Sequence, residues 1–201
     1  MTEKKQKRNN EEDLALKFSL FYKELRKKKK SEWDRVLPFN EYIVDRWEKA
    51  KFVKTGKNSS IYDSSYIYGD VVIGKNTWVG PFTLLDGSGG KLSIGDYCSI
   101  SSGVQIYTHD SVKWAITGGK ASYEKDSVKI GNCCYVGPHS IILKGTKIGK
   151  HSIIGAHAFV NSDIPSNSIV FGIPAKVVGK IKINGSKVVL KYFEKKKKYF
   201  K

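Results

Sequence analysis

Residues 130–160, IGNCCYVGPHSIILKGTKIGKHSIIGAHAFV, carry an aliphatic residue at every sixth position. In this stretch the repeating positions are Ile130, Val136, Ile142, Ile148, Ile154 and Val160. The same spacing occurs in two earlier blocks, at Ile61, Ile67, Ile73, Val79 and Leu85, and then at Ile94, Ile100 and Ile106. Neither the helical period of about 3.6 residues nor the strand period of 2 produces this pattern.

Small residues supply the second half of the repeat. Four positions after most of the aliphatic residues stands a small or short side chain, as at Ser65, Thr77, Cys98, Cys134, Ser140, Ser152 and Ala158. One large and one small inward residue per side fits a chain that turns a corner after each short strand. Three such sides form one coil, and successive coils stack as parallel strands about 4.8 Å apart. We predict a mainly β fold, a prism-like parallel β-helix over residues 58–180.

Two interruptions break the repeat. Three extra residues lie between Leu85 and Ile94, in LLDGSGGKLSIGD, and the step from Ile106 to Ile130 has the length of four repeats. The second step cannot be silent coil because Gly118 and Glu124 occupy aliphatic positions, so residues 111–127 are predicted to leave the coil as a loop. Long loops of repeat proteins usually carry function, and we expect an acceptor site at these interruptions.

The two ends of the chain have a different character. Residues 1–57 are predicted to form a tail and a helical cap, with an apolar stripe from Leu14 to Leu25 and with Asn40 capping a second helix over 41–52. Residues 181–201 are predicted to form a hairpin that turns at Asn184-Gly185, followed by a Lys-rich tail. Capping of the coil and oligomer contacts are their expected roles.

Charge and cysteine content limit the classes of function and partner that are expected. The chain has 36 Lys plus Arg against 19 Asp plus Glu, a net charge of +17, but most of the excess lies near the ends. The runs Lys27–Lys30 and Lys195–Lys198 are interpreted as solvated, or as weak contacts with an anionic membrane surface, and no nucleic-acid partner is expected. Three cysteines without CxxC spacing predict neither disulfides nor zinc, and the absence of a signal-peptide pattern or long apolar run predicts a cytoplasmic protein.

The repeats, the segment IYTHDS and the ending DIPSNSIVFGIPAKVVGKI resemble the hexapeptide-repeat acyltransferases over about residues 58–180. Within that family they are most similar to the galactoside and maltose O-acetyltransferases and to the O-acetyltransferases of capsule and lipopolysaccharide sugars. The resemblance implies a left-handed parallel β-helix, a homotrimer, and acetyl-CoA bound between neighbouring subunits. It also implies acetylation of a sugar hydroxyl, in a surface polysaccharide or a small saccharide.

The resemblance also assigns residues. The catalytic base falls on His109, and Asp86 falls on a position near the acceptor sugar. Acetyl-CoA contacts carry over onto Pro138, Ala156, Asn161, Ser162 and Lys176. The chain departs from the family where Tyr135 replaces a frequent Trp and where Lys176 replaces a usual Arg.

The chemistry of acyl transfer can be argued from the residues as well. Transfer from a thioester to a hydroxyl needs a base, for which imidazole suits neutral pH, and donors for the tetrahedral oxyanion. His109 lies beside the long loop, with Asp110 as a candidate to orient it. Because Pro138 has no N–H, the Gly137 amide is the candidate oxyanion donor. Trp114 and Tyr123 are candidates to stack on a sugar.

Two alternatives remain open at this point. Lysines in the loop, Lys113 and Lys120, would suit N-acetylation of an amino sugar on a nucleotide carrier. His139 and His157 are one full coil apart and should stack at one corner, where a metal-binding protein of the carbonic anhydrase type would hold zinc. The characteristic close His pair of such proteins is missing, so corner solvation is the preferred interpretation and no metal is expected.

Overall fold

The structure, a computed structural model, describes the backbone of residues 2–193 and the side chains of residues 11–193. The chain forms two compact units that divide between Asp45 and Arg46. In the first unit, α1 (Thr2–Trp33) and α2 (Asn40–Ile43) are joined by an aromatic cluster. The ring of Phe39 lies 5.0 Å from that of Phe18 and 5.2 Å from that of Tyr22, which also contacts Tyr42.

The expected helix over 41–52 is wrong. Val44, with φ −106° and ψ 125°, ends α2 in extended backbone, and a separate helix α3 (Arg46–Ala50) begins in the second unit. Asn40 lies inside α2 and no side chain caps the helix at Phe39. Within the second unit α3 packs against β2 (Ser60–Ile61), and Ala50 is buried in the core.

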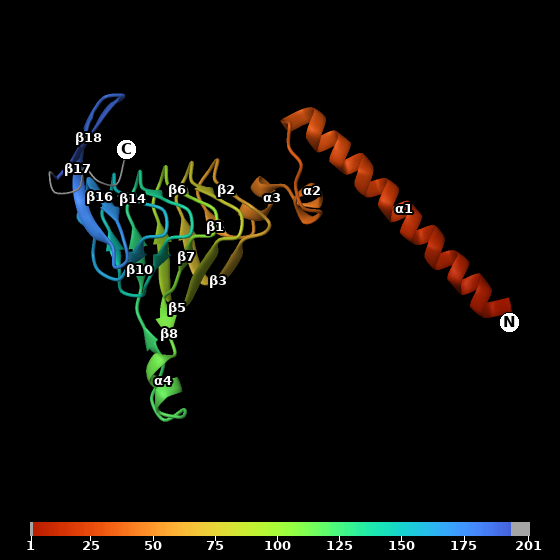
Figure 1. The fold of residues 1–201 in the computed structure, drawn as a ribbon, viewed down its shortest axis with the longest axis horizontal. Helices are drawn as coiled ribbons and strands as arrows, with labels where there is room; N and C mark the ends of the chain where they lie inside the picture. The colour runs from red at the N-terminus through yellow and green to blue at the C-terminus, as the bar shows by residue number, and fades with distance from the viewer. Residues whose placement is uncertain (1, 194–201) are drawn as a thin grey trace. The chain divides into compact units, whose positions relative to one another are not determined.

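The second unit confirms the parallel β-helix (Figure 1), with three faces of stacked strands. Face one contains β2, β4 (Trp78–Val79), β6 (Ser99–Ile100), β11 (Tyr135–Val136), β14 (Ile153–Ile154) and β16 (Ser168–Phe171). Face two contains the first halves of β3 (Tyr66–Ile73) and β5 (Leu84–Ile94), then β7 (Gln105–Ile106), β12 (Ile141–Ile142) and β15 (Phe159–Val160). Face three contains β1 (Lys54–Thr55), the second halves of β3 and β5, β10 (Val128–Ile130) and β13 (Lys147–Ile148).

Repeating aliphatic residues form the core, as the sequence predicts. Ile130 pairs with Ile148, and Val136 with Ile154, each pair one coil apart. Most repeat positions are at most 3% exposed, so each coil buries its large side chains on those of its neighbours. The small inward positions are buried too, and the Ser140 hydroxyl donates to the Gly155 carbonyl of the next coil at 2.8 Å.

The pairing of strands between successive coils shows where the two insertions lie. Val79 pairs with Ile100 across the short insertion, and Ile100 pairs with Val136 across the long one, so both coils are longer than the regular repeat. The last coil is shorter than the regular repeat, because Ile154 pairs with Val170. Both insertions fall where face two turns into face three. We call this turn the second corner; the first corner joins face one to face two, and the third corner joins face three to face one.

The long insertion leaves the second corner as an arm, visible as the projection that carries α4 in Figure 1. Its base is a two-stranded ribbon in which β8 (His109–Asp110) runs antiparallel to β9 (Glu124–Lys125). Its outer part contains α4 (Val112–Ile116), whose residues are all exposed. The predicted excursion over 111–127 is confirmed, and the coil resumes where Val128 pairs with Leu92.

The predicted C-terminal hairpin is also present. β17 (Lys176–Asn184) pairs antiparallel with β16 and with β18 (Lys187–Tyr192), and Gly185 takes the positive φ of +57° that the two-residue turn requires. The run Lys195–Lys198 lies outside the described residues, whereas Lys27–Lys30 lie at the end of α1. Among the described helices, none is long and apolar enough to span a membrane.

Candidate active site

His109 and Asp86 meet at the second corner, one from each insertion. The Nδ1 atom of His109 lies 2.7 Å from Oδ2 of Asp86. Both atoms are buried, and neither has a well-aligned hydrogen bond to another group among the described residues. The 2.7 Å contact between them is therefore the polar contact that the structure gives to each atom. The His109 side chain is 33% exposed and that of Asp86 is 3% exposed. One edge of the imidazole therefore faces a buried carboxylate while the ring stays accessible.

Asp86 is held by the three-residue insertion. Its Oδ1 atom accepts hydrogen bonds from the backbone N–H of Ser88, at 2.9 Å, and from the Ser88 hydroxyl. A carboxylate that accepts from the amide two residues on forms an Asx turn, the local geometry that Asp favours in such loops. The expectation that Asp86 binds the acceptor sugar does not fit this geometry, because its side chain is buried and both oxygens face protein groups.

Gly89 lets the two insertions approach closely. A Cβ atom built at Gly89 would lie 2.4 Å from the Cβ of His109 and 2.4 Å from the Thr108 carbonyl oxygen. The Gly89 amide donates to the Thr108 hydroxyl at 3.0 Å, so the loop is tied to the strand that carries His109. The position requires a residue without a side chain.

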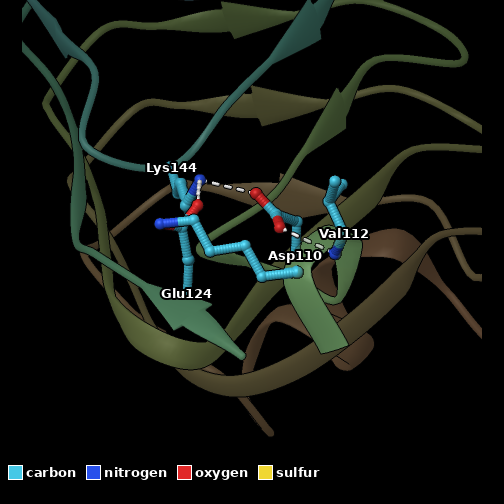
Figure 2. Close-up of polar contacts among 5 residues, drawn as sticks. Asp110, Val112, Glu124 and Lys144 are labelled. Carbon is cyan, nitrogen blue, oxygen red and sulfur yellow. Dashed lines mark hydrogen bonds and ion pairs between the residues drawn. The ribbon is translucent and has the colours of Figure 1, made fainter. Parts of the chain in front are cut away.

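Asp110 does not orient the imidazole. Its carboxylate accepts from the Val112 amide at 3.0 Å and pairs with Nζ of Lys144 at 2.5 Å (Figure 2). Lys144 comes from the second corner of the next coil and also contacts Glu124 at 3.2 Å, and Lys113 pairs with Glu124 at 2.5 Å. Successive strand residues point to opposite faces, which is why Asp110 turns away from the partner of His109.

Lys144 joins the two strands at the base of the arm. Asp110 and Glu124 stand opposite each other on β8 and β9, where two carboxylates alone would repel. The hydrogen bond to Lys144 lowers the pKa of Asp110, hydrogen bonds to Lys113 and Lys144 lower that of Glu124, and the bond to Asp110 raises that of Lys144. Lowered carboxyl pKa values add stability that is lost as pH falls through them, and a raised Lys pKa adds stability that is lost as pH rises through it. The cluster is therefore intact between these limits, which include neutral pH.

The aromatic residues of the arm extend the site outward. The rings of His109 and Tyr123 stack with centroids 6.3 Å apart and an interplanar angle of 5°, and Trp114 meets Tyr123 edge-on at 5.7 Å. Trp114 and Tyr123 are each 44% exposed. They thus form an accessible aromatic wall beside the imidazole. Of the two loop lysines that would suit a nucleotide-linked acceptor, both are exposed, and Lys113 is ion-paired with Glu124.

The residues expected to bind acetyl-CoA lie at two corners. Asn161 and Ser162 are exposed at the second corner, on the same edge of the coil stack as His109. Pro138 and Ala156 occupy the first corner, and Lys176 is exposed at the start of β17. Within one chain, the first-corner residues are therefore separated from His109 by the width of face two.

Two parts of the expected groove need correction. The Gly137 amide donates to the Ile154 carbonyl at 2.8 Å within the coil ladder, so it is not free to stabilise an oxyanion near His109. The 18-residue spacing of Gly137–Pro138, Gly155–Ala156 and Ile173–Pro174 predicts a track of small or flat residues along one side of the coil stack. The shortened last coil breaks this track, because it places Phe171 and not Ile173 against Gly155. The shortening could not be seen in the spacing, since no repeat aliphatic follows Val160 at six.

The histidines and cysteines outside the site lie where the repeat places them. His139 and His157 stack at the first corner with ring centroids 5.3 Å apart, as predicted from their separation by one coil. The described residues contain no cluster of three metal-ligating side chains. Cys98 and Cys134 are buried, and their thiols donate to the carbonyls of Gly131 and Gly149, each at 3.2 Å.

Three contributors to the site were missed at the sequence level. Ser88 and Gly89 lie in the inserted LLDGSGG segment, where the Asp-x-Ser spacing was a signal for an Asx turn. Lys144 gave no signal, because it lies within an uninterrupted repeat and its partners come from the arm.

Comparison with known proteins agrees with this architecture. The family described as "Bacterial transferase hexapeptide (six repeats)" matches residues 127–162. Galactoside O-acetyltransferase of Escherichia coli K12 is 28% identical over 143 residues, which cover 66% of each chain. Protein CapG of Staphylococcus aureus is 36% identical over 116 residues, covering 52% of this chain and 66% of CapG. The chain is therefore similar to the hexapeptide-repeat transferases, and it spans just under two thirds of the length of these relatives.

Solved structures share the fold. A maltose O-acetyltransferase from Clostridium difficile 630 superimposes with a TM-score of 0.54 at 24% identity, covering 82% of this chain and 88% of that one. AntD, an N-acyltransferase from Bacillus cereus, superimposes with a TM-score of 0.56 at 22% identity, covering 67% and 87% of the two chains. At these identities the likeness concerns the β-helix.

Proposed function

We propose that the protein is an O-acetyltransferase that uses acetyl-CoA to acetylate a sugar hydroxyl, with His109 as general base. The observation that carries the proposal is the pairing of His109 with the buried Asp86 at an accessible, aromatic-walled corner. The carboxylate fixes Nδ1 and favours the imidazolium that forms when Nε2 takes a proton. Asp86 is thus a positioning residue, not the sugar ligand expected from the resemblance.

The reaction then needs one transfer. Nε2 of His109 removes the proton of the acceptor hydroxyl, whose oxygen attacks the thioester carbonyl of acetyl-CoA. The tetrahedral intermediate expels the CoA thiolate, which takes the proton back from the imidazolium. No acyl-enzyme is proposed, since Cys98 and Cys134 are buried in the coil and the exposed Cys133 lies at the third corner, away from His109 at the second. Trp114 and Tyr123 stack on the apolar face of the sugar.

Acetyl-CoA is proposed to lie along Pro138, Ala156, Asn161, Ser162 and Lys176. Pro138 and Ala156 lie at a different corner from His109, so a second copy must bring its first corner to the second corner of its neighbour. This requirement supports the homotrimer that the family resemblance implies, with active sites between subunits. Analytical ultracentrifugation should give three times the 22.6 kDa chain mass, and a monomer that turns over acetyl-CoA would exclude shared sites.

The acceptor class is tested by an acetyl-CoA turnover assay. Release of free CoA is measured with hexoses, amino sugars and nucleotide sugars, and the products are identified by mass spectrometry and NMR. Acetylation of a hydroxyl of a hexose or polysaccharide unit is expected, which the name of galactoside O-acetyltransferase also supports. Acetylation of nitrogen on a nucleotide-linked amino sugar would favour the N-acyltransferase alternative. Because acetyl-CoA is the proposed donor, the cytoplasm is the proposed location of the reaction.

A metal-binding function remains the second candidate, favoured by the stacked His139 and His157. Metal analysis of the purified protein separates the two proposals. We expect less than one zinc per trimer and full turnover after chelation. Stoichiometric zinc that His139→Ala removes would favour the metal protein.

A further inference from the structure

We propose that the C-terminal ribbon, residues 176–192, docks on an anionic membrane surface. This inference goes beyond the proposed function and does not depend on catalysis. The ribbon continues the sheet of face one and projects beyond the last coil, as the paired strands β17 and β18 show in Figure 1. For the ribbon itself the sequence predicts capping or oligomer contacts, and it predicts weak membrane contacts only for the Lys-rich runs near the two ends of the chain.

One face of the ribbon is apolar and exposed. The register pairs Ile181 with Leu190 and Ile183 with Val188, and residues directly opposite each other share a face. Ile183, Val188 and Leu190 are 46%, 58% and 43% exposed. These side chains surround the turn, so the apolar surface lies at the tip of the ribbon. A tip of this kind can enter the headgroup region of a bilayer.

The other face of the ribbon carries the lysines. The register pairs Lys180 with Lys191 and Asn184 with Lys187, and places Lys182 between them, opposite the exposed Val189. Like charges opposite each other destabilise a ribbon unless an anion neutralises them. The sequence has no acidic residue between Asp163 and Glu194, and none of these lysines is ion-paired within the described part of the chain.

A groove beside the ribbon enlarges the positive surface. It has a volume of about 830 Å³ and is formed where the third corner meets the ribbon. Lys150 and His151 line it from the corner, and Lys182 and Lys187 line it from the ribbon. The surface thus combines cations, which attract acidic lipid headgroups, with exposed aliphatic side chains at the tip.

An anionic bilayer fits this combination better than the other partners do. A nucleic acid is usually bound by Arg with stacking aromatic residues, whereas the ribbon has lysines and aliphatic side chains. A second copy would bring the same uncompensated lysines toward each other. An anionic bilayer offers negative charge and an apolar interior at one surface.

Co-sedimentation of the full-length protein with vesicles tests the proposal. The vesicles are phosphatidylcholine alone or phosphatidylcholine with phosphatidylglycerol. Binding to the anionic vesicles only is expected, and Lys182→Gln with Lys187→Gln should weaken it about tenfold or more. Ile183→Ser with Val188→Ser should also weaken it, and these exposed changes should leave circular dichroism and thermal stability unaltered.

The matched control is Lys129→Gln with Lys147→Gln, which removes two exposed, paired lysines from face three. This variant should bind vesicles as the wild type does. Equal losses in the control and the ribbon variants would overturn the proposal, as would equal binding to neutral vesicles. An oligomer that the Ile183→Ser, Val188→Ser variant dissociates, without vesicle binding by the wild type, would assign the ribbon to a second copy instead.

Discussion

The residue that sets the proposed chemistry is Asp86, whose carboxylate is buried against His109. Asp86→Asn keeps the shape of the side chain and removes its charge, so the imidazolium loses its partner. We expect kcat to fall about 100-fold, within the range of general-base effects, with KM changed less than about threefold. Steady-state CoA release against acceptor concentration and pH measures both constants.

The control for this prediction is Asp70→Asn. Asp70 is an exposed carboxylate in the same corner one coil earlier and pairs with Lys54. Its loss should leave kcat unchanged. A kcat for Asp86→Asn equal to that of the wild type would show that Asp86 does not position the base.

The close approach of Gly89 to His109 gives a second prediction. Gly89→Ala places a methyl group 2.4 Å from the Cβ of His109, so the imidazole or the loop must move. Because a misplacement of about 1 Å can cost about 100-fold in rate, we expect kcat/KM to fall by at least tenfold. Gly118→Ala in the arm is the control: its Cβ would meet no atom within 4 Å, so it adds only the backbone strain of a φ of +61°, in an exposed part of the arm, and should keep kcat/KM within about threefold of the wild type. Normal turnover by Gly89→Ala would contradict the described packing.

Sequence reasoning proposes His109 as the base, but it gives the place beside the imidazole to Asp110, whereas the structure has Asp86 there. Asp110 was a natural candidate because it follows His109 in the chain, but the alternation of β8 turns it toward Lys144. Asp86 was assigned to the sugar because the register that brings it beside His109 depends on the exact length of two insertions. Only three-dimensional pairing could decide between the two carboxylates.

At the scale of elements, the arm is the part that the repeat does not specify. Lys144 bridges Asp110 and Glu124 and so ties both strands of the arm to the next coil. Lys144→Met removes the bridge and leaves two facing carboxylates. Amide exchange in residues 109–125 should rise at least about threefold, because Asp110 then loses its cation and only the Lys113–Glu124 pair still offsets the cross-strand repulsion.

Activity should respond to the same change. The loosened arm should lower the affinity for the acceptor, so KM should rise more than kcat falls, and Lys144→Arg should restore most of the loss. Lys147→Met, which changes an exposed lysine on the following strand, serves as the control. Unchanged exchange in the Lys144→Met arm would show that the bridge does not hold the arm.

The elements themselves were predictable to different degrees. The coil strands follow from the aliphatic repeat because each position meets its equivalent in the next coil, as Ile130 meets Ile148. The helix expected over 41–52 fails because Val44 takes extended backbone. This segment lies outside the repeat, so its backbone conformation is not indicated by any recurring position. The short last coil was missed for the same reason, because the pairing of Ile154 with Val170 occurs only once and repeats no earlier spacing.

For the whole molecule, stability should reside in the aliphatic columns. Ile142→Ala removes a fully buried side chain between Ile106 and Val160, and should destabilise the protein by about 2–5 kcal/mol. Ile116→Ala, at a 78% exposed position of the arm, should change stability by less than about 0.5 kcal/mol. Chemical denaturation of both variants measures the difference, and equal stabilities would contradict a core made of these columns.

The fold as a whole could be predicted from one stretch of sequence, whereas the site depends on contacts between successive coils at the second corner. His109 is the proposed base, the short insertion holds its partner Asp86, and the proposed acetyl-CoA track lies partly at another corner. The most direct test of this account is CoA release by His109→Ala, compared with His139→Ala at the first corner, using the acceptor that the wild type acetylates. We predict that His109→Ala loses at least about 100-fold in kcat while retaining CoA binding, and that His139→Ala keeps at least half of the activity. Equal rates for His109→Ala and the wild type would contradict the proposed mechanism.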